Sequence, residues 1–280
     1  MIWATIARKE IDDAIRSRML WVIIAVFGVV SAFLSVILSF VPEIGASSTM
    51  AVTMAAQSAQ TLGPIIALIA AYLAIAGERE SGSIKVLLGL PPSRGDVILG
   101  KLIGRGLVVA AGLMAGFLIA GGVILAVYGS IPLGAFVLTT LLTGLLGLVF
   151  VGIAVGISAS TATRARAMTL SIGLYLVIVL FWDLFAQFAH LAVRGSFPGT
   201  TVPSWYVFLQ SLSPVGAYDL LVTTVLAGAT TGTLPSLATQ LEAGIVPVFL
   251  SSGAMLSILV LWGLVPLMVG YLRFSRTDLA

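Results

Sequence analysis

Three of the eleven acidic side chains and five of the fourteen basic ones gather in one stretch, residues 77–105, which has a long apolar run on each side. The stretch contains Glu78, Arg79, Glu80, Lys85, Arg94, Asp96, Lys101 and Arg105. A charged side chain in the middle of a bilayer costs roughly 2.5–3.5 kcal/mol on insertion scales. We therefore expect these groups to lie in water or against a partner protein, where their chemistry is ionic contact.

One motif in this stretch is a false match to a nucleotide site. Residues 95–101 (GDVILGK) fit the GxxxxGK pattern of a phosphate-binding loop. Leu102 stands where a Ser or Thr hydroxyl should meet Mg²⁺, and the preceding PPSR is not a buried strand. Such a loop needs a strand, a glycine turn and a helix N-terminus that aim N–H groups at phosphates. We reject a nucleotide site here, so an ATPase that drives this chain would be another polypeptide.

The residue types in the sequence do not favour a metal site or an enzyme active site. There is no cysteine, and His190 is the single histidine, which makes thiolate and histidine-built metal sites implausible. Met50 and Met54 could contribute thioethers to Cu(I), but two are few for a site and packing is favoured. The chain has no HExxH and no nucleophile turn with a usable histidine. We expect no catalytic residue and no bound metal.

Four polar residues inside apolar stretches can be interpreted either as functional or as structural. Ser31, Ser35 and Ser39 recur every four residues and could line a path for a substrate, or they could be small residues for helix packing. Asp183 is an acid within an apolar span and could bind substrate or a partner helix, or it could reach the water interface.

Composition sets the class of the protein. Of its 280 residues, 59% are apolar and 9% are charged, whereas a soluble domain is nearer a quarter charged. The mean hydropathy is +1.16. The chain is predicted to be an all-α integral membrane protein with a single transmembrane domain over residues 1–280.

The apolar pattern predicts six transmembrane helices, at residues 20–41, 61–77, 102–127, 134–157, 167–189 and 248–272. Residues 1–19 read as an amphipathic helix in the membrane interface. Residues 43–60 read as an outer loop leading into an interfacial helix. The Pro-rich segment 191–247 contains an apolar stretch at 215–227 that is too short to cross, so a re-entrant or interfacial helix is expected there.

Basic residues orient these spans. All except Arg194 fall before the first span, after the second, after the fourth or after the last. The positive-inside rule then places both termini and the charged loop 78–101 in the cytoplasm and segment 191–247 outside. The basic residues flank apolar spans without interleaved aromatics, so they do not indicate nucleic-acid binding.

The charged loop resembles that of the permeases of ABC type 2 exporters. Residues 78–85 (ERESGSIK), the pair Leu87–Leu88, residues 92–94 (PSR) and Gly100–Lys101 fit the family pattern, with Ser83 where Thr is common. The LSP at 212–214 resembles an element before the family's last span. Six spans and a leading interfacial helix agree in layout.

This resemblance implies the permease subunit of an exporter in the cell membrane. Two such subunits, alike or different, would join two cytoplasmic ABC ATPases, which bind the ATP and Mg²⁺. The loop would be the coupling helix, with contacts from Glu78, Arg79, Glu80, Ser81, Gly82, Ser83, Lys85 and Arg94. The alternative role for these charges is to keep a loop in water.

The sequence indicates less about the substrate and the direction of transport. An apolar route between glycine-rich spans suits a lipid-like or amphipathic cargo, while related permeases export drugs, lipids, glycans, peptides or ions and one branch serves nitrous-oxide-reductase maturation. The segment 191–247 could cap the exit or seat an extracytoplasmic partner. The alternative function is a membrane scaffold or assembly protein that transports nothing itself.

Overall fold

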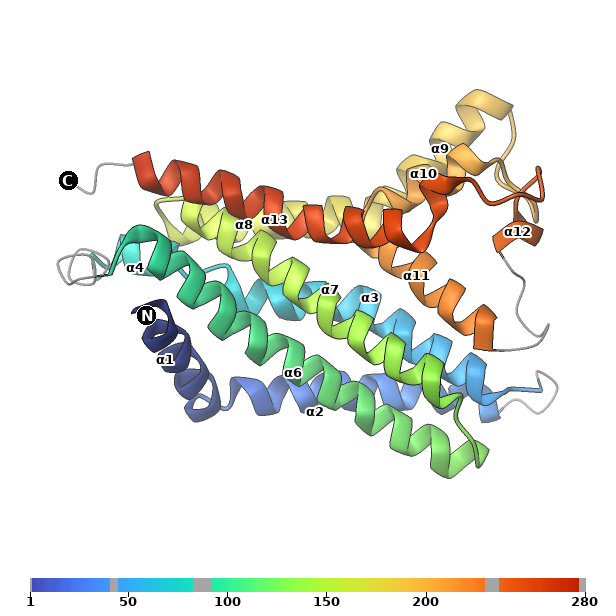
Figure 1. The fold of residues 1–280 in the computed structure, drawn as a ribbon, viewed down its shortest axis with the longest axis horizontal. Helices are drawn as coiled ribbons and strands as arrows, with labels where there is room; N and C mark the ends of the chain where they lie inside the picture. The colour runs from blue at the N-terminus through green and yellow to red at the C-terminus, as the bar shows by residue number, and fades with distance from the viewer. Residues whose placement is uncertain (1, 41–44, 83–91, 230–236, 277–280) are drawn as a thin grey trace.

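The computed structural model describes residues 2–40, 45–82, 92–229 and 237–276, which form helices and one isolated β-bridge, between Val202 and Leu241. Six helical stretches in this part of the chain are long and apolar enough to cross a bilayer: Met19–Val36, Ser48–Glu80, Arg94–Tyr128, Leu133–Ser160, Arg164–Arg194 and Ser252–Arg276. They run along the long axis of the molecule (Figure 1). The predicted all-α integral membrane fold is confirmed.

Helix α7 (Leu133–Ser160) is the most enclosed of the spans, with 72% of its most apolar window buried. It packs against α6 (Arg94–Tyr128), α13 (Ser252–Arg276) and α3 (Ser48–Ala71), while α2 (Met19–Val36) packs against α6 and α3. Close contact depends on glycine, because a Cβ on Gly116 would lie 3.0 Å from the backbone nitrogen of Gly28. The bundle core is therefore built by backbones that approach one another directly.

Two helix starts differ from the sequence prediction. Helix α3 begins at Ser48, so residues 48–60 belong to the second span and the prediction of an outer loop and separate interfacial helix there was wrong. Its small residues mislead a hydropathy reading, yet Ala51, Val52 and Ala55 are buried against neighbouring helices. Helix α6 begins at Arg94, eight residues before the predicted span, because Ser93 and Asp96 form a capping box.

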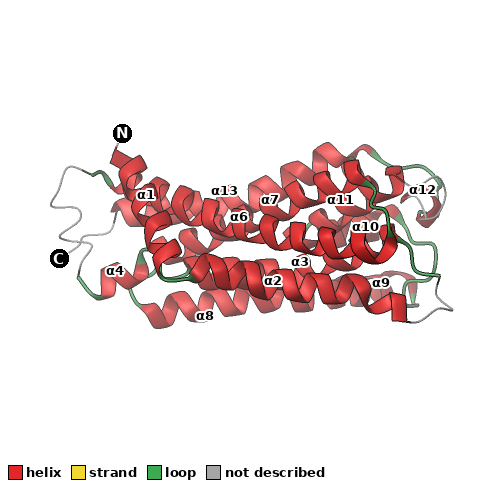
Figure 2. Cartoon of the chain, turned by 90° about the horizontal axis from the view of Figure 1, so that it is seen from below, coloured by secondary structure: helices red, strands yellow, loops and turns green. Residues whose placement is uncertain are grey.

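The fifth span lies at the edge of the bundle. It runs without a break through α8 (Arg164–Tyr175), the π-helical segment η3 (Leu176–Phe181) and α9 (Trp182–Arg194). Only 11% of its most apolar window is buried within the chain, and Figure 2 shows α8 along one edge of the bundle. Its apolar side chains are thus left for lipid or a second membrane subunit.

Between α9 and α13 lies an insertion that contains α10 (Ser204–Ser211), α11 (Pro214–Ala229), α12 (Leu237–Gln240) and the short turn η4 (Val248–Leu250). Helix α11 matches the predicted short helix at 215–227 and packs on α13, α7 and α3. The β-bridge and an ion pair of 2.6 Å between Arg194 and Glu242 tie the two sides of the insertion together.

The two ends of the bundle differ in chemistry. The short turn η1 (Ile37–Phe40) ends the described part of the first span, and the insertion lies at the same end. Helices α1 (Ile2–Arg16) and α4 (Ala76–Glu80), the first turns of α6 and the last turn of α13 lie at the other, which we call the charged end (Figure 1).

Candidate functional site

At the centre of the charged end is an ion cluster made of Glu10, Glu78, Lys101 and Arg105. The Nζ of Lys101 lies 2.7 Å from Oε1 of Glu10 and 2.7 Å from Oε1 of Glu78. Its side chain is only 3% exposed, and a buried ammonium is tolerated when it is paired and hydrogen-bonded. Three separate elements, α1, α4 and α6, therefore meet at one lysine.

Arg105 completes this cluster one helical turn beyond Lys101. Its Nε lies 2.7 Å from Oε2 of Glu10, and its Nη1 donates to the carbonyl of Ala70 at 2.6 Å. Burial raises the pKa of Glu10, but the charges of Arg105 and Lys101 outweigh that effect and hold the pKa below 4.5. Glu10 is thus an ionised carboxylate that clamps α1 onto α6.

The surface beneath α1 is shaped by two glycines of α6. A Cβ on Gly100 would lie 2.6 Å from the Cβ of Ile6, and one on Gly104 would lie 2.7 Å from the carbonyl oxygen of Ala7. No larger residue fits without moving α1. The Gly100–Lys101 pair therefore serves as a docking surface with an adjacent cation. Because Lys101 bonds two carboxylates inside a helix, these residues do not form a phosphate-binding loop.

The chain that enters the charged loop 78–101, which we call the hairpin, is fixed to the connection between α7 and α8. Ser158 Oγ accepts the backbone N–H groups of Ile75 at 2.9 Å and Ala76 at 3.0 Å, where α3 gives way to α4. Arg79 Nη1 donates to the carbonyls of Thr161 at 2.9 Å and Ala159 at 3.4 Å. Glu80 accepts the backbone N–H of Arg164, at the start of α8. Both residues are thus engaged within the chain.

The chain leaving the hairpin is fixed to the end of α13. Arg94 Nη1 donates to the carbonyls of Phe274 and Ser275, and its guanidinium carbon lies 5.4 Å from the centre of the Phe274 ring. A cation at the C-terminal end of a helix is stabilised by the exposed carbonyls there. Arg94 thereby links the first turn of α6 to the last span.

Of the predicted coupling residues, Glu78, Arg79, Glu80 and Arg94 all lie at the charged end, where their side chains bond other parts of the chain. Ser81 and Gly82 follow α4, and Gly82 has a φ of 75°, which favours glycine. Ser83 and Lys85 lie outside the described residues. Sequence reasoning missed Glu10 as a member of the cluster. The signal available was the spacing of Lys101 and Arg105, four residues apart on one helical face.

The predicted path residues are not brought together. Ser31 and Ser35 are fully buried; the Ser31 hydroxyl lies 2.6 Å from that of Ser58 in α3, and Ser35 bonds the carbonyl of Ala32 at 2.8 Å. Ser39 is exposed and bonds its own turn at 2.6 Å. These contacts are those of helix packing. Asp183 lies elsewhere, beside a cavity in the insertion.

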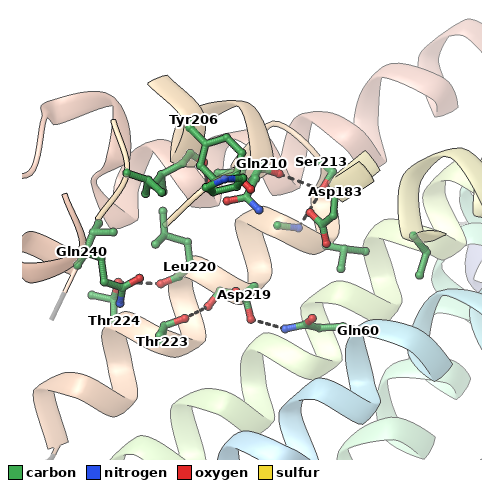
Figure 3. Close-up of a pocket in the computed structure, with 18 of the residues that line it drawn as sticks. Gln60, Asp183, Tyr206, Gln210, Ser213, Asp219, Leu220, Thr223, Thr224 and Gln240 are labelled. Carbon is green, nitrogen blue, oxygen red and sulfur yellow. Dashed lines mark hydrogen bonds between the residues drawn. The ribbon is translucent and has the colours of Figure 1, made fainter. Parts of the chain in front are cut away.

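That cavity has a volume of about 390 Å³ and is lined by α3, the fifth span, α10, α11, α12 and the loop at 198–202. Figure 3 shows Asp183 and Asp219 on its wall with Gln60, Tyr206 and Gln210. None of the three path serines lines it. The sequence reading singled out Asp183 but missed Asp219, which sits in the short apolar stretch of α11.

Comparison with known proteins agrees with this architecture. Residues 4–279 match the family model described as ABC-2 family transporter protein. A protein of Pseudomonas aeruginosa named "Probable ABC transporter permease protein NosY" is 34% identical over 282 residues, covering 99% of this chain and 98% of the relative. A protein of the same name from Stutzerimonas stutzeri is 32% identical over 228 residues, covering 79% of this chain and 80% of the relative. The chain therefore belongs to the ABC-2 family of transporter proteins.

Proposed function

We propose that this chain is the membrane permease subunit of an ABC exporter and that the charged end is the site of coupling to a separate ATPase. Family membership and the two permease relatives support a permease subunit. In this proposal the chain lies in a cell membrane, and its charged end faces the cytoplasm. Two permease subunits join two ABC ATPases, which hold ATP and Mg²⁺.

The observation that carries the coupling role is how the base of the hairpin is connected. Its two sides are bonded to α1 through Lys101, to the α7–α8 connection through Arg79, and to the end of α13 through Arg94. A load applied to the hairpin would therefore reach several spans together. A loop that served only to keep its charges in water would have no need for these internal contacts.

The contacts also suggest two different roles for the predicted coupling residues: holding the loop in place and contacting the ATPase. Arg79, Glu80 and Arg94 bond within the chain, so they hold the hairpin in place and transmit its displacement. Contact with the ATPase then falls to the loop residues that follow Glu80 in sequence, among which Lys85 is the charged residue predicted for that role. Acidic groups on the ATPase are the expected partners of Lys85.

The test separates docking from folding. Lys85→Glu is introduced into the permease co-expressed with its ATPase, and Lys9→Glu, on the exposed side of α1, is the matched control. We expect Lys85→Glu to reduce co-purification of the ATPase and the hydrolysis that depends on the permease by about tenfold, while Lys9→Glu leaves both unchanged. Full retention of both in Lys85→Glu would reject the coupling assignment.

The same preparation tests the alternative of a scaffold without transport. An exporter predicts that the ATPase hydrolyses ATP faster in the complete complex when cargo is added as a membrane extract. A complex whose hydrolysis never responds to the permease or to the extract would favour the scaffold function.

A further inference from the structure

The cavity in the insertion has a chemistry that the coupling role does not use. Its polar wall is built by residues from several separate segments of the chain, including Gln60, Asp183, Tyr206, Gln210, Asp219 and Thr223. A volume of about 390 Å³ falls within the usual range of small-molecule sites. The question is which kind of molecule this wall would hold.

The first carboxylate, Asp183, has no hydrogen bond or ion pair within the described chain. It lies in the fifth span, between η3 and α9, where apolar side chains surround it in sequence. An ionised group in such a setting requires water or a counter-charge. The side chain of Asp183 is exposed and lies on the cavity wall, so water or a counter-charge in the cavity can reach it (Figure 3).

The second carboxylate, Asp219 of α11, is exposed and lies on the cavity wall. Its Oδ1 accepts one hydrogen bond, from Nε2 of Gln60, and its other carboxylate oxygen has no hydrogen-bond partner in the described chain. No basic side chain is among the residues that line the cavity there. The cation of this region, Arg194, is paired with Glu242 at 2.6 Å. The described residues that line the cavity therefore supply no counter-charge to these two carboxylates.

A third group on the wall points independently to a ligand. Tyr206 is only 5% exposed, yet its hydroxyl makes no hydrogen bond within the described residues. Its ring is held edge-on against His190, at 5.1 Å between centres, and against Trp205 at 6.1 Å. Burial and the charge of Asp183 raise the pKa of Tyr206, so the hydroxyl stays neutral. The side chain is buried, but its hydroxyl oxygen is accessible from the cavity that it lines, so a molecule in the cavity can form a hydrogen bond with it.

We propose that this cavity binds a small organic ammonium compound, with Asp183 and Asp219 facing the positive charge and Tyr206 and Gln210 accepting hydrogen bonds. A bare metal ion fits less well, because the described residues hold no group of three His, Cys, Asp or Glu side chains, and hard cations take six or more oxygen ligands. The inference concerns binding and holds whether the compound is cargo or a regulator, so it does not rest on the proposed export.

The experiment measures binding of choline, ethanolamine and putrescine to the full-length chain purified in dodecyl maltoside, a neutral detergent without ammonium groups. We expect at least one to bind saturably at concentrations up to about 10 mM, where even millimolar sites fill. 3,3-Dimethylbutan-1-ol has the shape of choline without its charge and should not compete. Equal competition by this alcohol, or no saturable binding of any of the three amines, would overturn the proposal.

Variants then locate the site. Asp183→Asn and Asp219→Asn should each weaken amine binding by about tenfold or more, and Tyr206→Phe by about threefold to tenfold. Asp12→Asn changes an exposed acid at the opposite end and should have no effect. Gel filtration and thermal unfolding establish that each variant is folded. Undiminished binding in the Asp183→Asn/Asp219→Asn double variant, or binding of Mg²⁺ or Ca²⁺ with no displacement by amines, contradicts the proposal.

Discussion

Single charged residues at the charged end are important for the fold, because this chain has few charges and buries some of them. Lys101 is enclosed with two carboxylates, and Arg105 shares one of these. A buried ion pair adds little stability over an apolar pair, but removing one partner leaves the other charge without compensation. The cluster therefore acts mainly to specify how α1, α4 and α6 fit together.

Replacing Lys101 tests this role. Lys101→Met fills a similar volume but leaves Glu10 and Glu78 partly buried beside each other, so we expect a loss of about 3–5 kcal/mol in stability. Thermal unfolding of the purified protein measures it. Lys9→Met removes an exposed lysine from the same end and should change stability by no more than about 0.5 kcal/mol. Equal melting temperatures for the two variants would show that the ion cluster does not contribute to the stability of the fold.

Glu10 gives the cluster a defined response to acid. The pKa of Glu10 is held below 4.5 in the folded chain, so its ionised form stabilises the fold above the unfolded pKa, and this contribution is lost as the pH falls through the folded pKa. The melting temperature of the wild type should exceed that of Glu10→Gln at neutral pH, and the gap should narrow below about pH 4.5. A gap that is constant from pH 7 to 3 contradicts this assignment of charge.

At the scale of elements, the crossing of α7 and α13 depends on backbone contact. A Cβ on Gly152 would lie 2.8 Å from the carbonyl oxygen of Gly263, and one on Gly156 would lie 2.3 Å from that of Pro266. Backbone atoms cannot rotate away as a side chain can. Glycine at these positions therefore sets the distance between the two spans.

A single methyl group tests the crossing. Gly156→Ala must push α13 from α7, and overpacking of this kind costs about 1–3 kcal/mol, which thermal unfolding would report. Gly173→Ala is the matched control, since Gly173 lies inside α8 and a Cβ there meets no atom within 4 Å. Alanine favours a helix, so that control should be neutral or slightly stabilising. Tolerance of alanine at both sites would remove the packing argument.

Features set by local sequence could be predicted, whereas features set by contacts between distant residues could not. The spans were predictable because each must match a bilayer in hydropathy and length. The start of α3 was not, since Ala51 and Ala55 are buried by other helices rather than by lipid. The charges of the hairpin were visible, but pairing Glu10 with Lys101 joins residues 91 positions apart. Asp219 was missed because nothing local in α11 indicates that a cavity lies beside it.

At the scale of the whole molecule, the uneven placement of charge implies an orientation. The charged end holds the starts of α1 and α6 and the basic last turn of α13, whereas Arg194 lies at the insertion end and is paired there with Glu242. Basic residues near the ends of spans are retained on the cytoplasmic side. Coupling to a cytoplasmic ATPase requires the same orientation, so one measurement bears on both arguments.

The absence of cysteine from the chain makes that measurement simple. Thr201→Cys places one thiol in the exposed loop of the insertion, and Ser17→Cys places one in the exposed turn after α1. A membrane-impermeant maleimide added to intact spheroplasts should label Thr201→Cys and leave Ser17→Cys unlabelled until the membrane is opened. Labelling after opening verifies that both thiols are reactive. The reverse pattern would put the charged end outside, where no ATP-hydrolysing partner could reach it, and the coupling role would fall with the orientation.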